Sequence, residues 1–206
     1  MRPHARPRSS ELLEGLTKTH WWVVPGVWLP VCAFDVAKSL EWGLPAPAVL
    51  GNMGAGLAFW WFAEYALHRF VFHAPTSGPV ANAVHFIFHG AHHKFPRDAL
   101  RLVFPPVPAV AFALGLFKCL GLFAAGPASH LAMFAGLLVG YVAYDCTHYC
   151  IHHRDFKRSR AFQAVKANHL RHHYGDSAHG YGISNGLFDW AFGTGHVWRG
   201  AKRRGW

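Results

Sequence analysis

The sequence predicts an all-α, integral-membrane bundle of about four transmembrane helices with a histidine-rich helical cap. Hydrophobic residues make up 52% of the 206 residues and come in long blocks, while only 15% are charged. That composition is typical of a membrane protein. The formal net charge is +10, and the basic residues flank the apolar blocks, which favours a membrane surface over nucleic acid. The 17 histidines form clusters.

Two domain segments are expected: a basic N-terminal arm, residues 1–19, and one membrane domain, residues 20–206. The arm contains no apolar run, so no cleaved signal peptide is predicted. The chain has no Gly-rich phosphate loop, dinucleotide fingerprint or CxxC pair. These absences argue against nucleotide-binding and zinc-finger functions.

The first two apolar blocks predict helices over Trp21–Leu40 and Val49–Leu67. The first is the weaker, because prolines and charged residues interrupt it. The second contains Gly51, Gly54 and Gly56, which favour close contact between helices.

The third and fourth blocks predict helices over Phe104–Ala125 and His130–Tyr144. The fourth is shorter than the about 20 residues that a straight crossing needs, unless the helix continues through His152. With four crossings, every lysine and arginine except Lys38 and Lys118 lies on one side. The positive-inside rule makes that side cytoplasmic, and all the histidine clusters lie on it.

The histidine clusters read HRFVFH, HGAHH, HYCIHH and HLRHH. In a helix, the three histidines of HxxHH share one face. His68 and His73 are five residues apart, so we expect the helix to end or distort between them. Imidazole is a common ligand of transition metals, and these clusters predict a site for one or two ions.

Two acidic residues lie close to these clusters. Glu64 precedes His68 by one helical turn, and Asp145 precedes His148 by three residues. Both are predicted to hold a ligand's second nitrogen, although a snorkelling acid at a span end also explains Glu64. His85 and His153 are expected to support the ligands without binding metal.

A metal site with many imidazole ligands and no carboxylate ligand is unusual. Structural zinc needs four ligands, usually including thiolates, and soluble di-iron bundles use glutamates. A histidine-rich iron pair at a membrane surface fits activation of dioxygen for attack on a lipid C–H bond.

The order of the four motifs resembles the fatty acid hydroxylase superfamily of integral-membrane di-metal enzymes, which includes sterol desaturases. The stretches FHGAHHKFPRDALRLVFPP, YVAYDCTHYCIHH and GISNGLFDWAFGT are similar to its fatty acid 2-hydroxylase branch. The resemblance implies a monooxygenase that 2-hydroxylates a fatty acid or sphingolipid precursor. It also implies two iron ions, which zinc can replace in isolated protein, and dioxygen as co-substrate. The ligands it implies are His68, His73, His89, His92, His93, His148, His152, His169, His172 and His173.

The chain differs from longer family members because it has no haem domain of cytochrome type. We therefore expect a separate protein to donate electrons. No nucleic-acid partner is expected. The side chains expected to line the substrate entrance are Tyr174, Tyr181, Asn185 and Trp190, although an aromatic belt at the membrane interface explains the tryptophans about as well.

Three alternatives remain open. The same site can serve another lipid oxidation, such as sterol, alkane or carotenoid hydroxylation or desaturation. A non-catalytic membrane metal-binding protein or transporter is the second, although a transporter predicts ligands near the bilayer midplane. A structural zinc protein is the third. The lack of a C-terminal dilysine favours a bacterial inner membrane over the endoplasmic reticulum.

Overall fold

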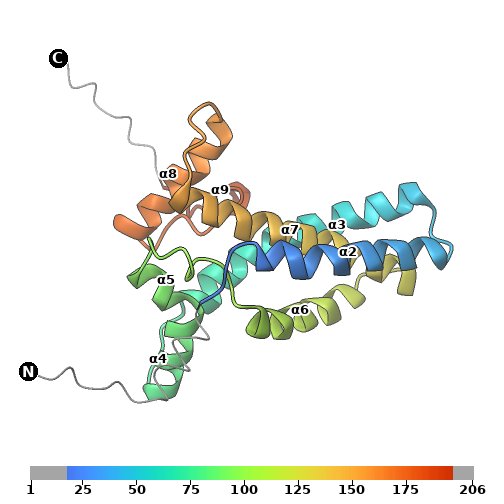
Figure 1. Ribbon diagram of the computed structural model, residues 1–206, viewed down its shortest axis with the longest axis horizontal. Helices are drawn as coiled ribbons and strands as arrows, with labels where there is room; N and C mark the ends of the chain where they lie inside the picture. Colours follow the sequence, from blue (N-terminus) through green and yellow to red (C-terminus); the bar gives the residue numbers. More distant parts are fainter. Residues whose placement is uncertain (1–17, 197–206) are drawn as a thin grey trace, which may run out of the picture.

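The computed structural model describes residues 18–196, and every regular element in that range is helical. Long helices lie side by side over most of the length of the molecule, and short helices cap one end of them (Figure 1). The predicted all-α class is confirmed for these residues. The predicted arm lies outside them except for its last two residues, where the Thr19 N–H donates to the Leu100 carbonyl at 2.7 Å.

The helices divide into a long set and a short set. The long helices are α2 (Val23–Glu41), α3 (Ala46–Leu67), α6 (Pro106–Gly121) and α7 (Pro127–His153). The cap contains α4 (Pro79–His85), α5 (Ala91–Lys94), α8 (Arg160–Tyr174), α9 (Leu187–Ala191) and the π-helical segments η1 (His68–Phe72) and η2 (Phe86–Gly90). Prolines in the first turns of α3, α6 and α7 cost no hydrogen bond, because those N–H groups have no partner inside the helix.

Within residues 18–196, α2 and α7 are the helices that are both long and apolar enough to cross a membrane. Helix α3 is long enough, but it contains Asn52, Glu64 and several glycines. Helix α6 has 16 residues and spans about 24 Å, short of the about 30 Å of a bilayer core. Length and composition therefore support two of the four predicted crossings. Helix α7 does continue past Tyr144, to His153.

Helix α7 is central because it packs against both α2 and α3. At the α3–α7 crossing, a Cβ atom on Gly56 would lie 1.8 Å from the Met133 carbonyl oxygen, and one on Gly136 would lie 1.9 Å from that of Met53. Only glycine permits this approach. The prediction of close contact is confirmed for Gly56 but is wrong for Gly51 and Gly54, where an added Cβ meets nothing within 4 Å.

The pairing of Met53 with Gly136 and of Trp60 with Gly140 shows that α3 and α7 run parallel. Their carboxyl ends therefore reach the same end of the bundle. That geometry brings His68, directly after α3, close to His148 in the last turns of α7.

Candidate metal centre

The structure gathers ten histidines at the capped end of the bundle, in two groups of five. Group one contains His68, His73, His89, His93 and His172. Group two contains His92, His148, His152, His169 and His173. These ten are the residues that the family resemblance implies as ligands. In each group, five ring nitrogens lie within 4.8 Å of one another.

The two HxxHH motifs divide in opposite ways. In HGAHH, the first and last histidines, His89 and His93, join group one, while His92 joins group two. In HLRHH, the first and last join group two, while His172 joins group one. Each group thus takes three histidines from the HxxHH motifs and two from a helix end. The sequence spacing predicted a shared face but not this exchange.

Two π-helical segments place group-one side chains. Segment η1 begins at His68 and closes with a hydrogen bond of 3.1 Å from the His73 N–H to the His68 carbonyl. The wider turn brings the two rings to a centroid distance of 5.0 Å although they are five residues apart. Segment η2 carries His89. The expected distortion between His68 and His73 is confirmed, and π-helical turns often occur at functional sites.

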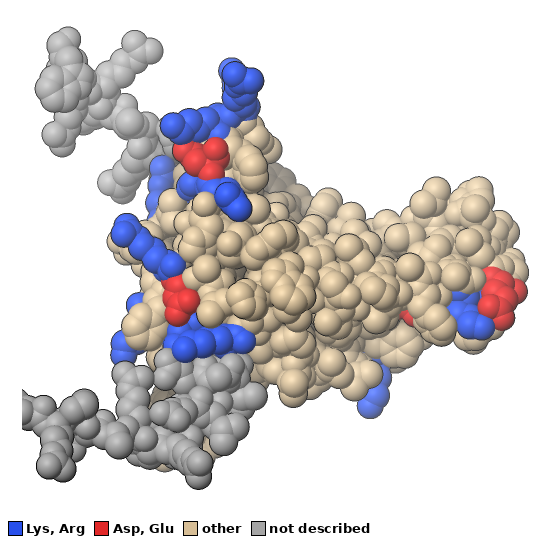
Figure 2. All heavy atoms as spheres, viewed as in Figure 1, with Lys and Arg blue, Asp and Glu red and all other residues tan. Residues whose placement is uncertain are grey.

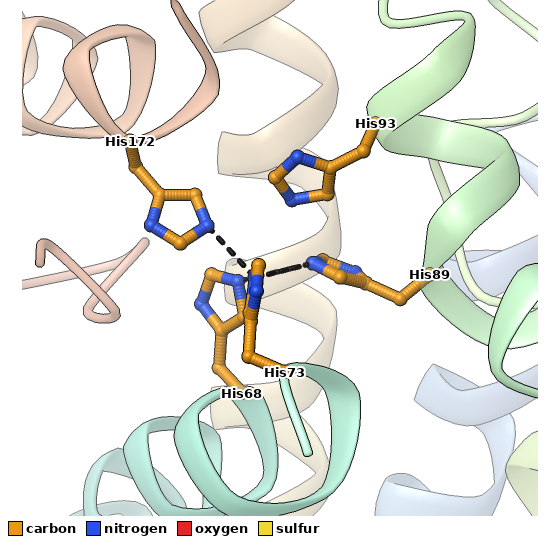
Figure 3. Close-up of side chains that lie close together, drawn as sticks. All are labelled: His68, His73, His89, His93 and His172. Carbon is orange, nitrogen blue, oxygen red and sulfur yellow. Dashed lines mark hydrogen bonds between the residues drawn. The ribbon is translucent and has the colours of Figure 1, made fainter. Parts of the chain in front are cut away.

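The facing nitrogens of group one are very close together. The Nε2 atom of His89 lies 3.2 Å from that of His68 and 3.1 Å from that of His73, and the His73 and His172 Nε2 atoms are 2.9 Å apart. Figure 3 shows the five rings pointing toward one small volume from three parts of the cap.

Group two has the same geometry. The Nε2 atom of His148 lies 2.9 Å from that of His92 and 3.0 Å from that of His169. That of His169 lies 3.0 Å from that of His152, and that of His92 lies 2.8 Å from that of His173.

These distances fit a metal ion in each group. Two nitrogens bound at right angles to one ion, with bonds of about 2.1 Å, are about 3.0 Å apart, and opposite ligands are about 4.2 Å apart. Each neutral ring carries one N–H, so one nitrogen meeting two others at 2.8–3.2 Å cannot satisfy all of them by hydrogen bonds. The Nε2 atom of His93 is buried and has no hydrogen-bond partner within residues 18–196. A cation among the lone pairs removes both problems.

The rings are neutral at pH 7, as ligation requires. Burial, together with the nearby rings of His172 and other histidines, lowers the pKa of His73 to about 4 and that of His93 to about 3. Burial also lowers the pKa of His68, His89 and His92 well below the usual value. Five protons so close together would repel one another, whereas a metal ion uses the neutral form.

The predicted supporting acids bind backbone amides, and neither bonds to a histidine among the residues that the structure describes. The Nδ1 atom of His68 donates to the Tyr181 carbonyl at 2.6 Å, while Glu64 accepts from the backbone of residues 183–184. Asp145 accepts from the Phe104 N–H at 3.3 Å. The prediction that these acids hold ligand nitrogens is wrong, because in both cases a loop amide reaches the carboxylate first.

The two supporting histidines lie beside the groups. His85 ends α4 and is half-buried, and the ring of His153 stacks on Tyr149 at 4.9 Å. Neither belongs to either group. Their supporting role stays a prediction. Sequence reasoning missed the carbonyls of Tyr181 and His179, which accept from His68 and His172 at 2.6 and 2.8 Å. The GISNGLFDW stretch was the available signal, but backbone acceptors leave no residue type to recognise.

The predicted substrate-entrance residues lie apart from the apolar cavity of the bundle. Tyr174 and Trp190 are largely exposed, Asn185 accepts from the Leu187 N–H, and Tyr181 packs on group-one rings. None of them lines the cavity enclosed by α3, α6 and α7. Its lining side chains are Trp60, Glu64, Leu67, Phe72, Phe104, Ala109, Phe112, Ala113, Leu116, Leu137, Leu138, Tyr141 and Tyr144.

Comparison with known proteins shows which family this chain belongs to. The family model of the fatty acid hydroxylases matches residues 53–194, which include all ten histidines. This chain belongs to the fatty acid hydroxylase family. The expected family and enzyme class, an oxidoreductase of the fatty acid hydroxylase kind, are therefore confirmed.

Individual relatives of this fatty acid hydroxylase agree. The dihydroceramide fatty acyl 2-hydroxylase FAH2 of Arabidopsis thaliana is 43% identical over 185 residues, covering 90% of this chain and 77% of its own. The fatty acid 2-hydroxylase of Homo sapiens is 35% identical over 90% of this chain and 55% of its own. The solved structure of full-length scs7p, in which only the hydroxylase domain is visible, matches with a TM-score of 0.84 and 36% identity, covering 92% of this chain and 72% of its own.

Proposed function

We propose that this chain is a membrane monooxygenase that hydroxylates the acyl chain of a fatty acid or sphingolipid precursor, at the carbon next to the carboxyl. The observation that carries the proposal is the convergence of ten histidines, in two groups, beside an apolar cavity. The names of the relatives, fatty acyl and ceramide hydroxylases, supply the substrate class.

The ten histidines are proposed to hold two iron ions, for which zinc substitutes in isolated protein. When bound, the iron pair supplies the oxidising chemistry that inserts one oxygen of dioxygen into a C–H bond with two electrons and two protons. The chain holds the rings neutral and fixes their directions. The protein must also bring one methylene of the substrate's acyl chain to the two histidine groups and keep the other methylenes away from them.

Two neighbouring cavities provide a route for the acyl chain of the substrate. A second cavity lies beside the metal groups and is lined by His89, His92 and His148. It shares Phe72, Phe104 and Tyr144 with the apolar cavity between α3, α6 and α7. We infer that the acyl tail occupies the apolar cavity and that these three aromatic side chains lie where the tail passes to the metal centre. This placement leaves the carboxyl end of the substrate at the cap.

The charge distribution supports a membrane orientation with four crossing helices and the cap on the cytoplasmic side. Lysine and arginine side chains gather over the capped end in Figure 2, and few lie at the opposite end. Segments 94–101 and 154–171 supply many of them. By the positive-inside rule the capped end faces the cytoplasm, in a bacterial inner membrane if the source is bacterial and in the endoplasmic reticulum if it is eukaryotic. The same basic surface suits an acidic, separate electron-donor protein.

The test is product analysis with and without the metal ligands. The chain and its His92→Ala/His172→Ala variant, which removes one ligand from each group, are expressed in the same host under labelled dioxygen. Acyl species carrying one labelled oxygen are expected only with the unaltered chain, and fragmentation places the hydroxyl. Species two hydrogens lighter would indicate desaturation. Unchanged lipids, with a competent electron donor present, would contradict the proposal.

A further inference from the structure

Four consecutive backbone amides next to group one all donate to buried carboxylates. The Tyr181 and Gly182 N–H groups donate to the two oxygens of Asp189 at 2.9 and 2.7 Å. The Ile183 and Ser184 N–H groups donate to one oxygen of Glu64 at 2.6 and 2.7 Å. Glu64 comes from α3 and Asp189 from α9, so two distant helices hold the same four-residue segment.

Further buried contacts hold this segment in place. Glu64 is 3% exposed and Asp189 is 2% exposed, so both carboxylates are shielded from water. The Ser184 hydroxyl donates to the second oxygen of Glu64, and the Thr194 hydroxyl donates to Asp189 at 2.8 Å. A Cβ atom on Gly182 would lie 2.0 Å from the Asn185 carbonyl oxygen, so only glycine fits there.

The held segment presents an acceptor to a metal ligand. The Gly182 N–H, which shares a peptide plane with the Tyr181 carbonyl, is tied to Asp189, and this carbonyl accepts from the Nδ1 atom of His68. The preceding turn presents the His179 carbonyl to the Nδ1 atom of His172, and its Gly180 N–H is tied to the Thr194 carbonyl at 2.8 Å. Both acceptors fix the tautomer that leaves Nε2 free to face an ion.

Three of the five group-two rings lack such support from the part of the chain that the structure describes. The Nδ1 atoms of His92, His169 and His173 are buried and have no hydrogen-bond partner among the described residues. The two groups are therefore alike in the spacing of the Nε2 atoms that face one another. They differ in the hydrogen bonds made by the Nδ1 atoms on the other side of the rings. A ligand whose second nitrogen is held loses less orientational freedom when it binds a metal.

We propose that Glu64 and Asp189 are positioning residues that, through the 181–184 segment, make group one the tighter of the two metal sites. The inference rests on the proposed metal centre. The predicted consequence is two unequal affinities in the unaltered chain. Loss of either carboxylate should weaken the binding of one ion by about 10- to 100-fold and leave the affinity for the other ion unchanged.

The hydrogen-bond geometry predicts different effects for the two conservative substitutions, Glu64→Gln and Asp189→Asn. Both amides at Glu64 share one oxygen, and the hydrogen-bond partner of the other oxygen is the Ser184 hydroxyl, which can also accept. Glu64→Gln should therefore keep the tighter affinity, whereas Glu64→Leu should lose it. At Asp189 each oxygen meets a backbone N–H, so Asp189→Asn places an amide donor against a donor and should lose it.

The experiment titrates the full, metal-stripped chain in detergent with Zn²⁺ in competition with a chromophoric chelator. Asp35→Leu is the matched control, because it removes an equally buried carboxylate from α2 and should leave both affinities unchanged. Combination with His89→Ala or His92→Ala assigns the weakened site. Glu64→Leu should change the affinity of the single ion left by His92→Ala and not that left by His89→Ala.

The outcomes distinguish the two proposals. An unaltered chain that binds no Zn²⁺ would overturn the metal centre itself. Two ions of equal affinity, equal weakening of both by Asp189→Asn, or the same loss in Glu64→Gln as in Glu64→Leu would overturn the positioning role alone. Melting temperatures of all variants, measured without metal, show whether a change in affinity is separate from a change in folding.

Discussion

His93 and His173 stack face to face, with ring centroids 4.1 Å apart and planes 19° apart, although they belong to different metal groups. The stack makes the two groups immediate neighbours. It also means that the position of one group-one ring depends on a group-two ring. A change at His93 should therefore reach group two through this pair of rings.

The first prediction concerns the division of one motif between the groups. His89→Ala and His92→Ala should each leave about one ion per chain where the unaltered protein holds two, because they remove ligands from different groups. The metal content of purified protein, measured by mass spectrometry, checks this. His20→Ala is the control, since His20 is exposed and belongs to neither group. Loss of both ions from either ligand variant would contradict two separate sites.

The second prediction follows from the stacked pair. His93→Ala removes a group-one ligand and also the ring that packs on His173, so it should weaken both sites, group two by several-fold. His89→Ala should leave the affinity of group two unchanged. Competition titration with Zn²⁺ compares the two variants. Identical group-two affinities in both would show that the stack carries no coupling.

The third prediction tests the acyl-chain route. Ala113 is buried and lines the apolar cavity, so Ala113→Phe should shorten it and reduce hydroxylation of long acyl chains by about tenfold or more. Shorter chains should be affected less. Ala111→Phe makes the same change at an exposed position of α6 and should have no effect. A chain-length series measured for both variants gives the answer, and equal losses at every length would argue against the route.

The fourth prediction concerns pH. The pKa is about 4 for His73 and about 3 for His93, whereas a histidine in an unfolded chain has a pKa of about 6.5. At pH values between the folded and the unfolded pKa of these residues, the unfolded chain therefore binds more protons than the folded chain. Stability should therefore fall as the pH falls below about 6.5. Melting temperatures of the metal-free chain, measured at a series of pH values from neutral down to mildly acidic, test this. His93→Gln removes one such group and should flatten the dependence; a dependence as steep as before would exclude His93 as a contributor.

The fifth prediction tests the helix crossing that aligns the two histidine-bearing ends. Gly136→Val forces a side chain into the Met53 backbone, and the expected loss of stability is about 3 kcal/mol or more. In a chain of this size that loss lowers the melting temperature by about 6 °C or more. Gly51→Val, on an open face of α3, is the control and should stay close to the unaltered protein. Similar melting temperatures for both variants would contradict the close crossing.

Local patterns in the chain were enough to predict the helical class, the helix order and, with the family resemblance, the ten histidines that meet at the site. Apolar blocks and histidine spacing are properties of neighbouring residues, and a helix or its distortion turns them directly into faces and ends. The distortion between His68 and His73 could be expected because five residues do not fit a whole turn of α-helix.

The grouping of the histidines and the contacts that support them depend on the folded arrangement of the helices. Residues of one motif separate into different groups because the site lies between helices, and the parallel packing of α3 and α7 sets where each ring arrives. The contact of the Tyr181 carbonyl with His68, and the amides that the two carboxylates hold, could not be predicted from the sequence for the same reason. A backbone acceptor has no residue type, and Glu64 meets Ile183 across 119 residues of chain only after folding.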